Sequence, residues 1–295
     1  MTRAYQAAAL ALSLALCSAA ACFGAGDATL RILFTFDARG RLPVLGEGPG
    51  DSAAPMPEIL RWGRIAAENE RAGSLLLDCG NTFFPGVLSR FSYGSVQNEI
   101  LGLAGASAKR VSQRDFLMGT QTLRTLQRKS AAAFLASNLE ADSAPFPASV
   151  TLRRAGRAVT VFALSDPSGG DASAELPEGF SITDPESALR ARVASIHGDS
   201  SLVICLLDEN LAARHPGILS VPGVNLFAIG STHSGPIVQA ALRNGGWVVH
   251  VPPFPQGFGR FEWHIEVRRD CIGQFASTTA EHTNEPCDAG FMDCD

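Results

Sequence analysis

The chain is organised around residues 75–86, Leu-Leu-Leu-Asp-Cys-Gly-Asn-Thr-Phe-Phe-Pro-Gly. Three consecutive leucines are typical of a strand that is covered on both faces. Gly80 and Gly86 release the backbone where this strand should end. Because ligand sites in open α/β sheets form beyond the carboxyl ends of the strands, the turn after the leucines is the candidate functional region.

Strands and helices alternate on both sides of this stretch, which predicts an α/β fold with added β-hairpins. Apolar spacing predicts helices over residues 58–72, 95–104, 120–129 and 184–196, the last with Asp184 as its N-cap. Strands are predicted over residues 30–36, 75–78, 108–111, 133–136, 150–154, 158–164, 201–207, 224–229, 237–242, 247–251 and 259–267. After residue 269 the periodicity is lost, and residues 270–295 are predicted to form a tail.

The composition indicates how large a hydrophobic core the chain can bury and which classes of partner it favours. The chain has 295 residues, of which 46% are hydrophobic, so it can bury a sizeable core. Its net charge of −5 gives no indication of a nucleic-acid partner.

The first 26 residues have the organisation of a secretory signal, with Arg3, an apolar run and then small residues. Two interpretations of its end stand side by side. Cleavage can follow the three alanines at 19–21, or Cys22 can be the lipidated first residue of a bacterial lipoprotein. Either one predicts an exported protein, periplasmic or held at the membrane only through a lipid anchor.

Three of the seven cysteines, Cys271, Cys287 and Cys294, crowd into the C-terminal segment. Outside the cytoplasm a disulfide among them is expected. Their spacing is not that of a zinc site.

Five polar turns follow predicted strands, and their order resembles the motifs of the calcineurin-like metallophosphoesterases. The resemblance is nearest to the N-terminal domain of the periplasmic 5′-nucleotidase and UDP-sugar hydrolase family, and it covers about residues 30–265. It implies a four-layer α/β/β/α sandwich of mixed sheets for residues 27–269. The turns that carry it begin at Asp37, Asp78, Ser112, Asp208 and Gly230.

That family uses two metal ions, about 3.5–4 Å apart, to activate water against a phosphate ester. Most of the positions that the resemblance assigns to this site are changed here. Asp37 and His233 keep the family's residue types. The other positions carry a residue type that differs from the family's. Arg39, Asp208 and Ser231 replace histidine ligands, and Arg114 replaces the catalytic histidine. Asn81 replaces the bridging aspartate, Gln113 an asparagine and Asp115 a glutamate.

Arginine does not bind metals in proteins, because its guanidinium stays protonated. The charges of Arg39 and Arg114 can instead be balanced by Asp37, Asp115 and Asp208. We therefore expect an internal ion-pair network in place of the binuclear centre, with no cofactor.

Several alternatives remain open at this stage. Asp37, Asn81, Asp208 and His233 are candidate ligands for a single divalent metal, Zn or Mn. Arg39 and Arg114 form either an anion pocket or salt bridges to Asp37 and Asp208. Cys79 is either a reactive thiol or a small buried residue.

The leading hypothesis is a secreted or lipid-anchored, 5′-nucleotidase-like protein that has lost catalysis and serves as a binding or assembly module. Its partner would be a phosphate-bearing small molecule or a cell-envelope protein. One alternative is an active phosphoester hydrolase with an altered or single-metal site. The other is a thiol-redox protein that uses Cys79 or the C-terminal cysteines.

Overall fold

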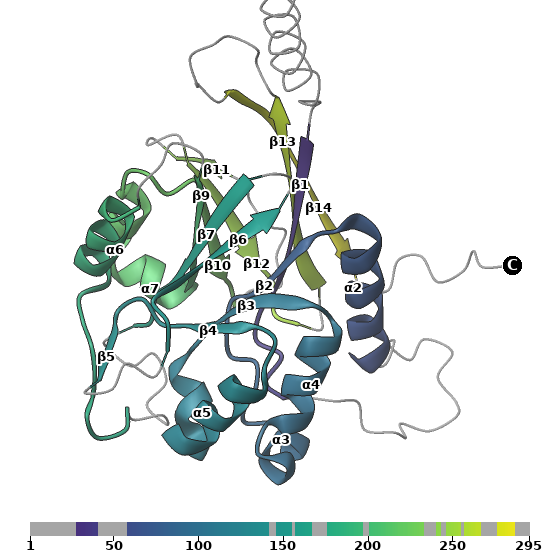
Figure 1. Cartoon of the computed structure of the whole chain (residues 1–295), viewed down its shortest axis with the longest axis vertical. Coiled ribbons are helices and arrows are strands. Elements are labelled where there is room, and N and C mark those ends of the chain that lie inside the picture. The colour runs from purple at the N-terminus through teal and green to yellow at the C-terminus, as the bar shows by residue number, and fades with distance from the viewer. Residues whose placement is uncertain are drawn as a thin grey trace, which may run out of the picture.

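A computed structural model gives the fold of the chain (Figure 1). It describes residues 28–40, 58–141, 146–154, 157–166, 176–196, 201–232, 240–242, 246–254, 257–266 and 276–286. The signal segment with Cys22, the candidate ligand His233, and Cys271, Cys287 and Cys294 lie outside these residues, so the expectations about them stay predictions. None of the helices in the described ranges has the length and apolar character needed to cross a membrane.

The first of two large sheets has six strands, in the order β14-β13-β1-β2-β3-β4. Strands β1 to β4 run parallel, whereas β13 and β14 extend the sheet antiparallel. Their bounds are β1 Ala28–Thr35, β2 Leu75–Asp78, β3 Ala106–Arg110, β4 Ala133–Leu135, β13 Gly257–Glu266 and β14 Ala276–Pro286.

The second sheet also has six strands, in the order β11-β12-β10-β9-β7-β6, and its four central strands are parallel. A separate antiparallel pair, β5 with β8, lies outside both sheets. The bounds are β5 Leu139–Ala141, β6 Ser149–Arg154, β7 Arg157–Ala163, β8 Phe180–Ile182, β9 Ser201–Asp208, β10 Leu226–Gly230, β11 Ala240–Ala241 and β12 Trp247–Val251.

Helices cover the outer faces of the two sheets, α2 and α4 on one side and α6 and α7 on the other (Figure 1). The α-helices span α2 Glu58–Ala72, α3 Val87–Ser92, α4 Ser95–Leu103, α5 Thr120–Lys129, α6 Pro185–Ala194 and α7 Glu209–Arg214, and the 3₁₀ helices span η1 Gln113–Met118 and η2 Pro216–Ser220. The predicted four-layer α/β/β/α sandwich of mixed sheets is confirmed.

The three leucines of β2 show how the layers are built. Leu75 and Leu77 belong to the core between the two sheets, and Leu76 belongs to the core between the first sheet and its helices. All three are fully buried, because successive side chains of a strand point to opposite faces and both faces are covered here.

Most predicted elements are present with ends shifted by one or two residues. The helices at 58–72 and 120–129 have the predicted bounds, and the Asp184 side chain accepts a 2.8 Å hydrogen bond from the Ser187 amide, as an N-cap should. The prediction of an aperiodic tail is wrong for residues 276–286, which form β14 against β13. This strand is polar and threonine-rich, so its pairing rests on backbone hydrogen bonds and not on an apolar pattern.

Candidate functional site

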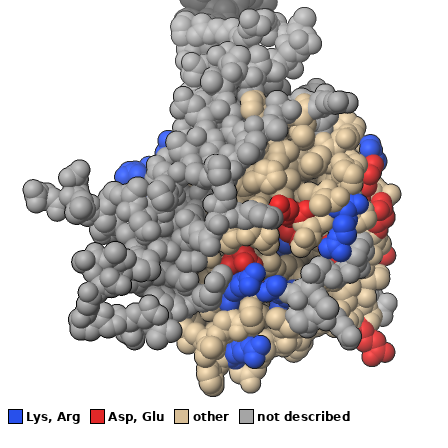
Figure 2. All heavy atoms as spheres, turned by 180° about the vertical axis from the view of Figure 1, so that it is seen from behind, with Lys and Arg blue, Asp and Glu red and all other residues tan. Residues whose placement is uncertain are grey.

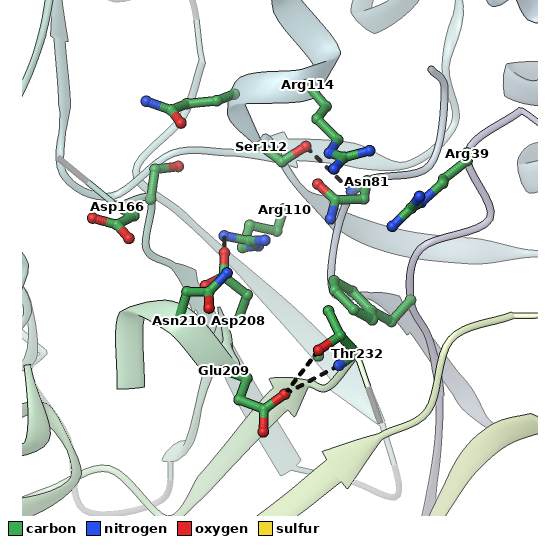
Figure 3. Close-up of a pocket in the computed structure, with 14 residues that line it drawn as sticks. Arg39, Asn81, Arg110, Ser112, Arg114, Asp166, Asp208, Glu209, Asn210 and Thr232 are labelled. Carbon is green, nitrogen blue, oxygen red and sulfur yellow. Dashed lines mark hydrogen bonds and ion pairs between the residues drawn. The ribbon is translucent and has the colours of Figure 1, made fainter. Parts of the chain in front are cut away.

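The turns that follow β1, β2, β3, β7, β9 and β10 meet at one pocket with a volume of about 80 Å³ (Figure 3). Its wall combines three arginines with three carboxylates and several amide and hydroxyl side chains. The lining residues are Phe36, Arg39, Asn81, Arg110, Ser112, Gln113, Arg114, Ser165, Asp166, Asp208, Glu209, Asn210, Gly230 and Thr232.

The turns after β1 and β2 are joined along their backbones. The amide of Asp37 donates to the carbonyl of Gly80 at 2.9 Å, and that of Arg39 donates to the carbonyl of Asn81 at 2.8 Å. Asp37, Arg39 and Asn81 all adopt positive φ angles, of 61°, 54° and 56°. This left-handed backbone costs an L-residue roughly 1 kcal/mol, so the hydrogen bonds between the turns hold a conformation that neither turn favours alone.

Asp78 is fully buried and stabilises the turn after β2 through hydrogen bonds. Its carboxylate accepts hydrogen bonds from the Thr35 hydroxyl at 2.7 Å, from the Gly80 amide at 3.0 Å, and from the Thr82 hydroxyl. Burial raises the pKa of Asp78 above its usual value, against the opposing effect of the nearby Lys109 ammonium. Asp78 therefore positions the turn and does not line the pocket.

Asp37 forms the ion pair that the sequence predicts with Arg39. The Arg39 Nε lies 2.8 Å from the Asp37 Oδ2, and Asp37 is only 3% exposed. One oxygen of the aspartate kept at a ligand position of the family is thus held by a guanidinium.

Asp208 also pairs with an arginine, but the predicted partner is wrong. Arg110, and not Arg114, places its Nη1 2.8 Å from the Asp208 Oδ2. The other oxygen of Asp208 accepts a 2.9 Å hydrogen bond from the Leu211 amide and caps α7. Arg114 lies on the pocket wall and points toward Asn81 (Figure 3).

Asp115 has a different role from the predicted one. It forms a 2.7 Å ion pair with Lys109, and both side chains are completely buried. Asp115 also accepts from the amide and the hydroxyl of Ser112, which caps η1. The Lys109 ammonium lies 4.6 Å from the centre of the Phe83 ring. Asp115 therefore balances Lys109 and not Arg39 or Arg114, and it does not line the pocket.

Lys109 and Arg110 were not among the predicted site residues. The signal was nevertheless in the sequence, because two adjacent cations occur inside a predicted strand. Such residues are almost never buried unless they are paired, so they imply buried acceptors nearby.

The remaining predicted positions divide between the pocket and its surroundings. Gln113 and Asn81 line the pocket, while Ser231 donates to the Glu209 carboxylate at 3.0 Å. The amide of Thr232 donates to the same Glu209 oxygen at 3.1 Å. Glu209, which the sequence analysis did not single out, therefore joins the ends of β9 and β10.

The described residues do not fit the binuclear metal centre that the fold implies. Carboxylate oxygens of both Asp37 and Asp208 are engaged by guanidiniums that carry the charge a dication would bring. In the part of the chain that the structure describes, no group of three or more His, Cys, Asp or Glu side chains could hold a metal ion.

Cys79 is fully buried beneath the pocket floor, and its sulfur lies 3.9 Å from the carbonyl oxygen of Ala228. Burial raises the pKa of this thiol well above its usual range, more than the nearby Arg110 lowers it. Cys79 thus has the environment of an inert core residue, and the structure gives no support to a reactive thiol at this position.

Comparison with known proteins identifies solved structures that share the fold at low sequence identity. No protein-family model matches the sequence, and no curated protein matches it either. Solved structures do match. A calcineurin-like phosphoesterase from Bacillus subtilis superposes with a TM-score of 0.71 at 13% identity, covering 90% of this chain and 92% of that one.

Two further matches come from Thermus thermophilus. A 5′-nucleotidase precursor superposes with a TM-score of 0.67 at 15% identity, and a sulfate thiohydrolase with a TM-score of 0.65 at 17% identity. They cover 88% and 89% of this chain, which spans only 55% and 57% of theirs. The chain therefore has the fold of 5′-nucleotidases and calcineurin-like phosphoesterases, as its strand-end motifs predicted, and it spans about half the length of two of these neighbours.

Proposed function

We propose that this chain is an exported binding module on a phosphoesterase fold, in which arginine–carboxylate pairs have replaced metal-dependent hydrolysis. One observation carries the proposal: Asp37 and Asp208 are held by Arg39 and Arg110 at 2.8 Å each. A carboxylate paired with a guanidinium is a weaker ligand for a metal ion, because the pair occupies one carboxylate oxygen and the guanidinium charge repels a nearby dication.

At three positions that the resemblance assigns to the family's catalytic site, the pocket carries side chains that do not transfer protons. Arg114 stands where the family has the histidine that protonates the leaving group, and an arginine does not release its proton in a protein. Asn81 and Gln113 are neutral amides, which orient a ligand through hydrogen bonds but do not act as bases. The pocket is therefore suited to holding a ligand in place and not to cleaving it.

Export is part of the proposal and rests on residues 1–26, which have the charge and apolar pattern of a secretory signal. Cys22 would add a lipid anchor if it becomes the first residue of the mature protein. The expected location is the periplasm or a membrane surface, with a phosphate-bearing small molecule or a cell-envelope protein as the partner.

A hydrolysis assay tests this proposal. The purified chain is incubated with AMP and with a chromogenic phosphate diester, with Mn²⁺, Zn²⁺ or Mg²⁺ added or with EDTA. We expect rates at the background level in every condition, and no difference between the chain and a D37N/D208N variant. A metal-dependent rate far above background that this variant loses would show instead that catalysis survives.

A further inference from the structure

We propose that the pocket binds a small tetrahedral oxyanion, of the phosphate or sulfate type, directly on the guanidinium groups of Arg39 and Arg114. Arg110 lies beneath this anion and completes the positive side of the site. The inference rests on the proposed function, because it takes the arginines as replacements for metal ions. It adds the chemical class of the ligand and the residues that contact it.

Arg39 and Arg114 come from different strand ends and point toward the same space beside Asn81 (Figure 3). The ion pair of Arg39 with Asp37 runs through Nε, only one of the guanidinium's three nitrogens, and the Arg39 side chain is 34% exposed. Guanidinium groups bind phosphate and sulfate oxygens with strong, charge-assisted hydrogen bonds. The amides of Asn81 and Gln113 add neutral donors to the same wall.

Arg110 lies beneath the pocket and belongs to its positively charged side. It is 1% exposed and donates to the carbonyl of Cys79 at 2.6 Å and to that of Leu164 at 3.0 Å, besides pairing with Asp208. Its Nη2, however, is buried without a hydrogen-bond partner among the residues that the structure describes. This nitrogen lies beside Gly80 and is not exposed to the pocket, so Arg110 would act on an anion through its charge and not through a hydrogen bond.

The carboxylates on the opposite wall do not compete for this role, because each has a partner within the protein. Asp208 pairs with Arg110, Asp166 pairs with Arg214, and Glu209 accepts hydrogen bonds from Ser231 and Thr232. Asp166 and Asp208 are thus neutralised by arginines, whereas Glu209 is held by neutral donors at the end of the pocket away from Arg114 (Figure 3). An anion would therefore bind at the end formed by Arg39 and Arg114.

The volume limits the ligand to a small group. A cavity of about 80 Å³ has room for a few water molecules, and so for one tetrahedral oxyanion, but not for a whole nucleotide. Any larger ligand would place its phosphate or sulfate group in the pocket and leave the rest outside.

Isothermal titration calorimetry with the full chain in EDTA tests the proposal, with inorganic phosphate, sulfate and glycerol phosphate as separate ligands. We expect one site for each oxyanion, weakened by added NaCl because the charges of Arg39 and Arg114 are partly screened. R39Q and R114Q should each weaken binding about 10-fold or more, since each removes charge-assisted hydrogen bonds.

R128Q is the matched control, because Arg128 is an exposed arginine of α5 outside the pocket. The affinity of R128Q for phosphate should equal that of the unchanged chain. Thermal unfolding without ligand shows which variants are folded. If R39Q is not folded, the affinity of R114Q alone tests the proposal. Absence of phosphate binding at millimolar concentration, or equal binding by all four proteins, would overturn the proposal while leaving the loss of hydrolysis intact. Binding that needs a divalent metal and is accompanied by hydrolysis would overturn both.

Discussion

Arg110 holds oxygen atoms from three separate parts of the chain. These are the carbonyl after β2 at Cys79, the carbonyl after β7 at Leu164, and the Asp208 carboxylate at the end of β9. Because β2 belongs to the first sheet and β7 and β9 to the second, this single side chain ties the two sheets together at the edge where the pocket lies. Its contribution to stability should therefore exceed that of a surface ion pair.

Replacing Arg110 with methionine tests this role. R110M would leave Asp208 without its counter-charge and the two carbonyls without donors, which should lower the free energy of unfolding by about 3 kcal/mol. R190M is the control, since Arg190 forms an exposed i,i+4 pair with Glu186 that is expected to contribute less than about 0.5 kcal/mol. Urea unfolding at pH 7 measures both variants, and equal losses would contradict the role of Arg110.

At the scale of elements, the turns after β1 and β2 form one unit that positions Asp37, Arg39 and Asn81. Gly40 is central to this unit: its amide donates to the Thr82 carbonyl at 2.7 Å, and its φ angle is +60°. A Cβ at Gly40 would collide with the Phe83 carbonyl oxygen and the Ser89 side chain, so the turns can approach this closely only because residue 40 is glycine.

Two glycine-to-alanine substitutions separate the loss of stability caused by the collision from the loss caused by the backbone conformation. Gly73 has a φ angle of +58°, nearly the same as Gly40, but a Cβ there would meet no atom within 4 Å. G73A should lower the free energy of unfolding by about 1 kcal/mol because of its conformation alone. G40A should cost a further 1–3 kcal/mol or so through overpacking, and it should also weaken phosphate binding by displacing Arg39. Chemical denaturation of the two variants measures this difference, and equal losses would show that the turns are not in the close contact described here.

The sequence predicted the helices and strands more accurately than the contacts between side chains. Apolar periodicity located β2, α2 and α5, because burial on one or both faces leaves a pattern along the chain. The same reasoning missed β14, whose polar residues carry no such pattern. It also paired Asp208 with Arg114, because the family motif directed attention to the turn residues. The true partner, Arg110, lies two residues before Ser112 and inside the strand, and only the folded structure shows which cation reaches the carboxylate.

At the scale of the whole molecule, the fold and the chemistry of the site differ in how much of the family pattern they keep. The overall fold matches that of phosphoesterases, with a TM-score of 0.71 for one of them. At the pocket, Asp37 is paired with Arg39 and Asp208 with Arg110, and the described residues include no group of three or more His, Cys, Asp or Glu side chains that could hold a metal ion.

The distribution of charge over the molecule agrees with a small, internal site. In the described part of the face shown in Figure 2, basic and acidic side chains lie side by side, without a broad surface of one sign. The described part of this face therefore has no broad basic surface. Recognition is therefore expected to depend on short-range contacts inside the pocket.

The central claim is that arginine–carboxylate pairs have replaced the metal centre, and elemental analysis of the whole chain tests it most directly. The purified chain is equilibrated with excess Mn²⁺ or Zn²⁺, desalted and measured for bound metal per mole of protein, beside a sample treated with EDTA. Because Asp37 and Asp208 already neutralise Arg39 and Arg110, we expect far less than one metal ion per chain in every sample. One or two ions per chain, retained through desalting and lost in a D37N/D208N variant, would contradict the account.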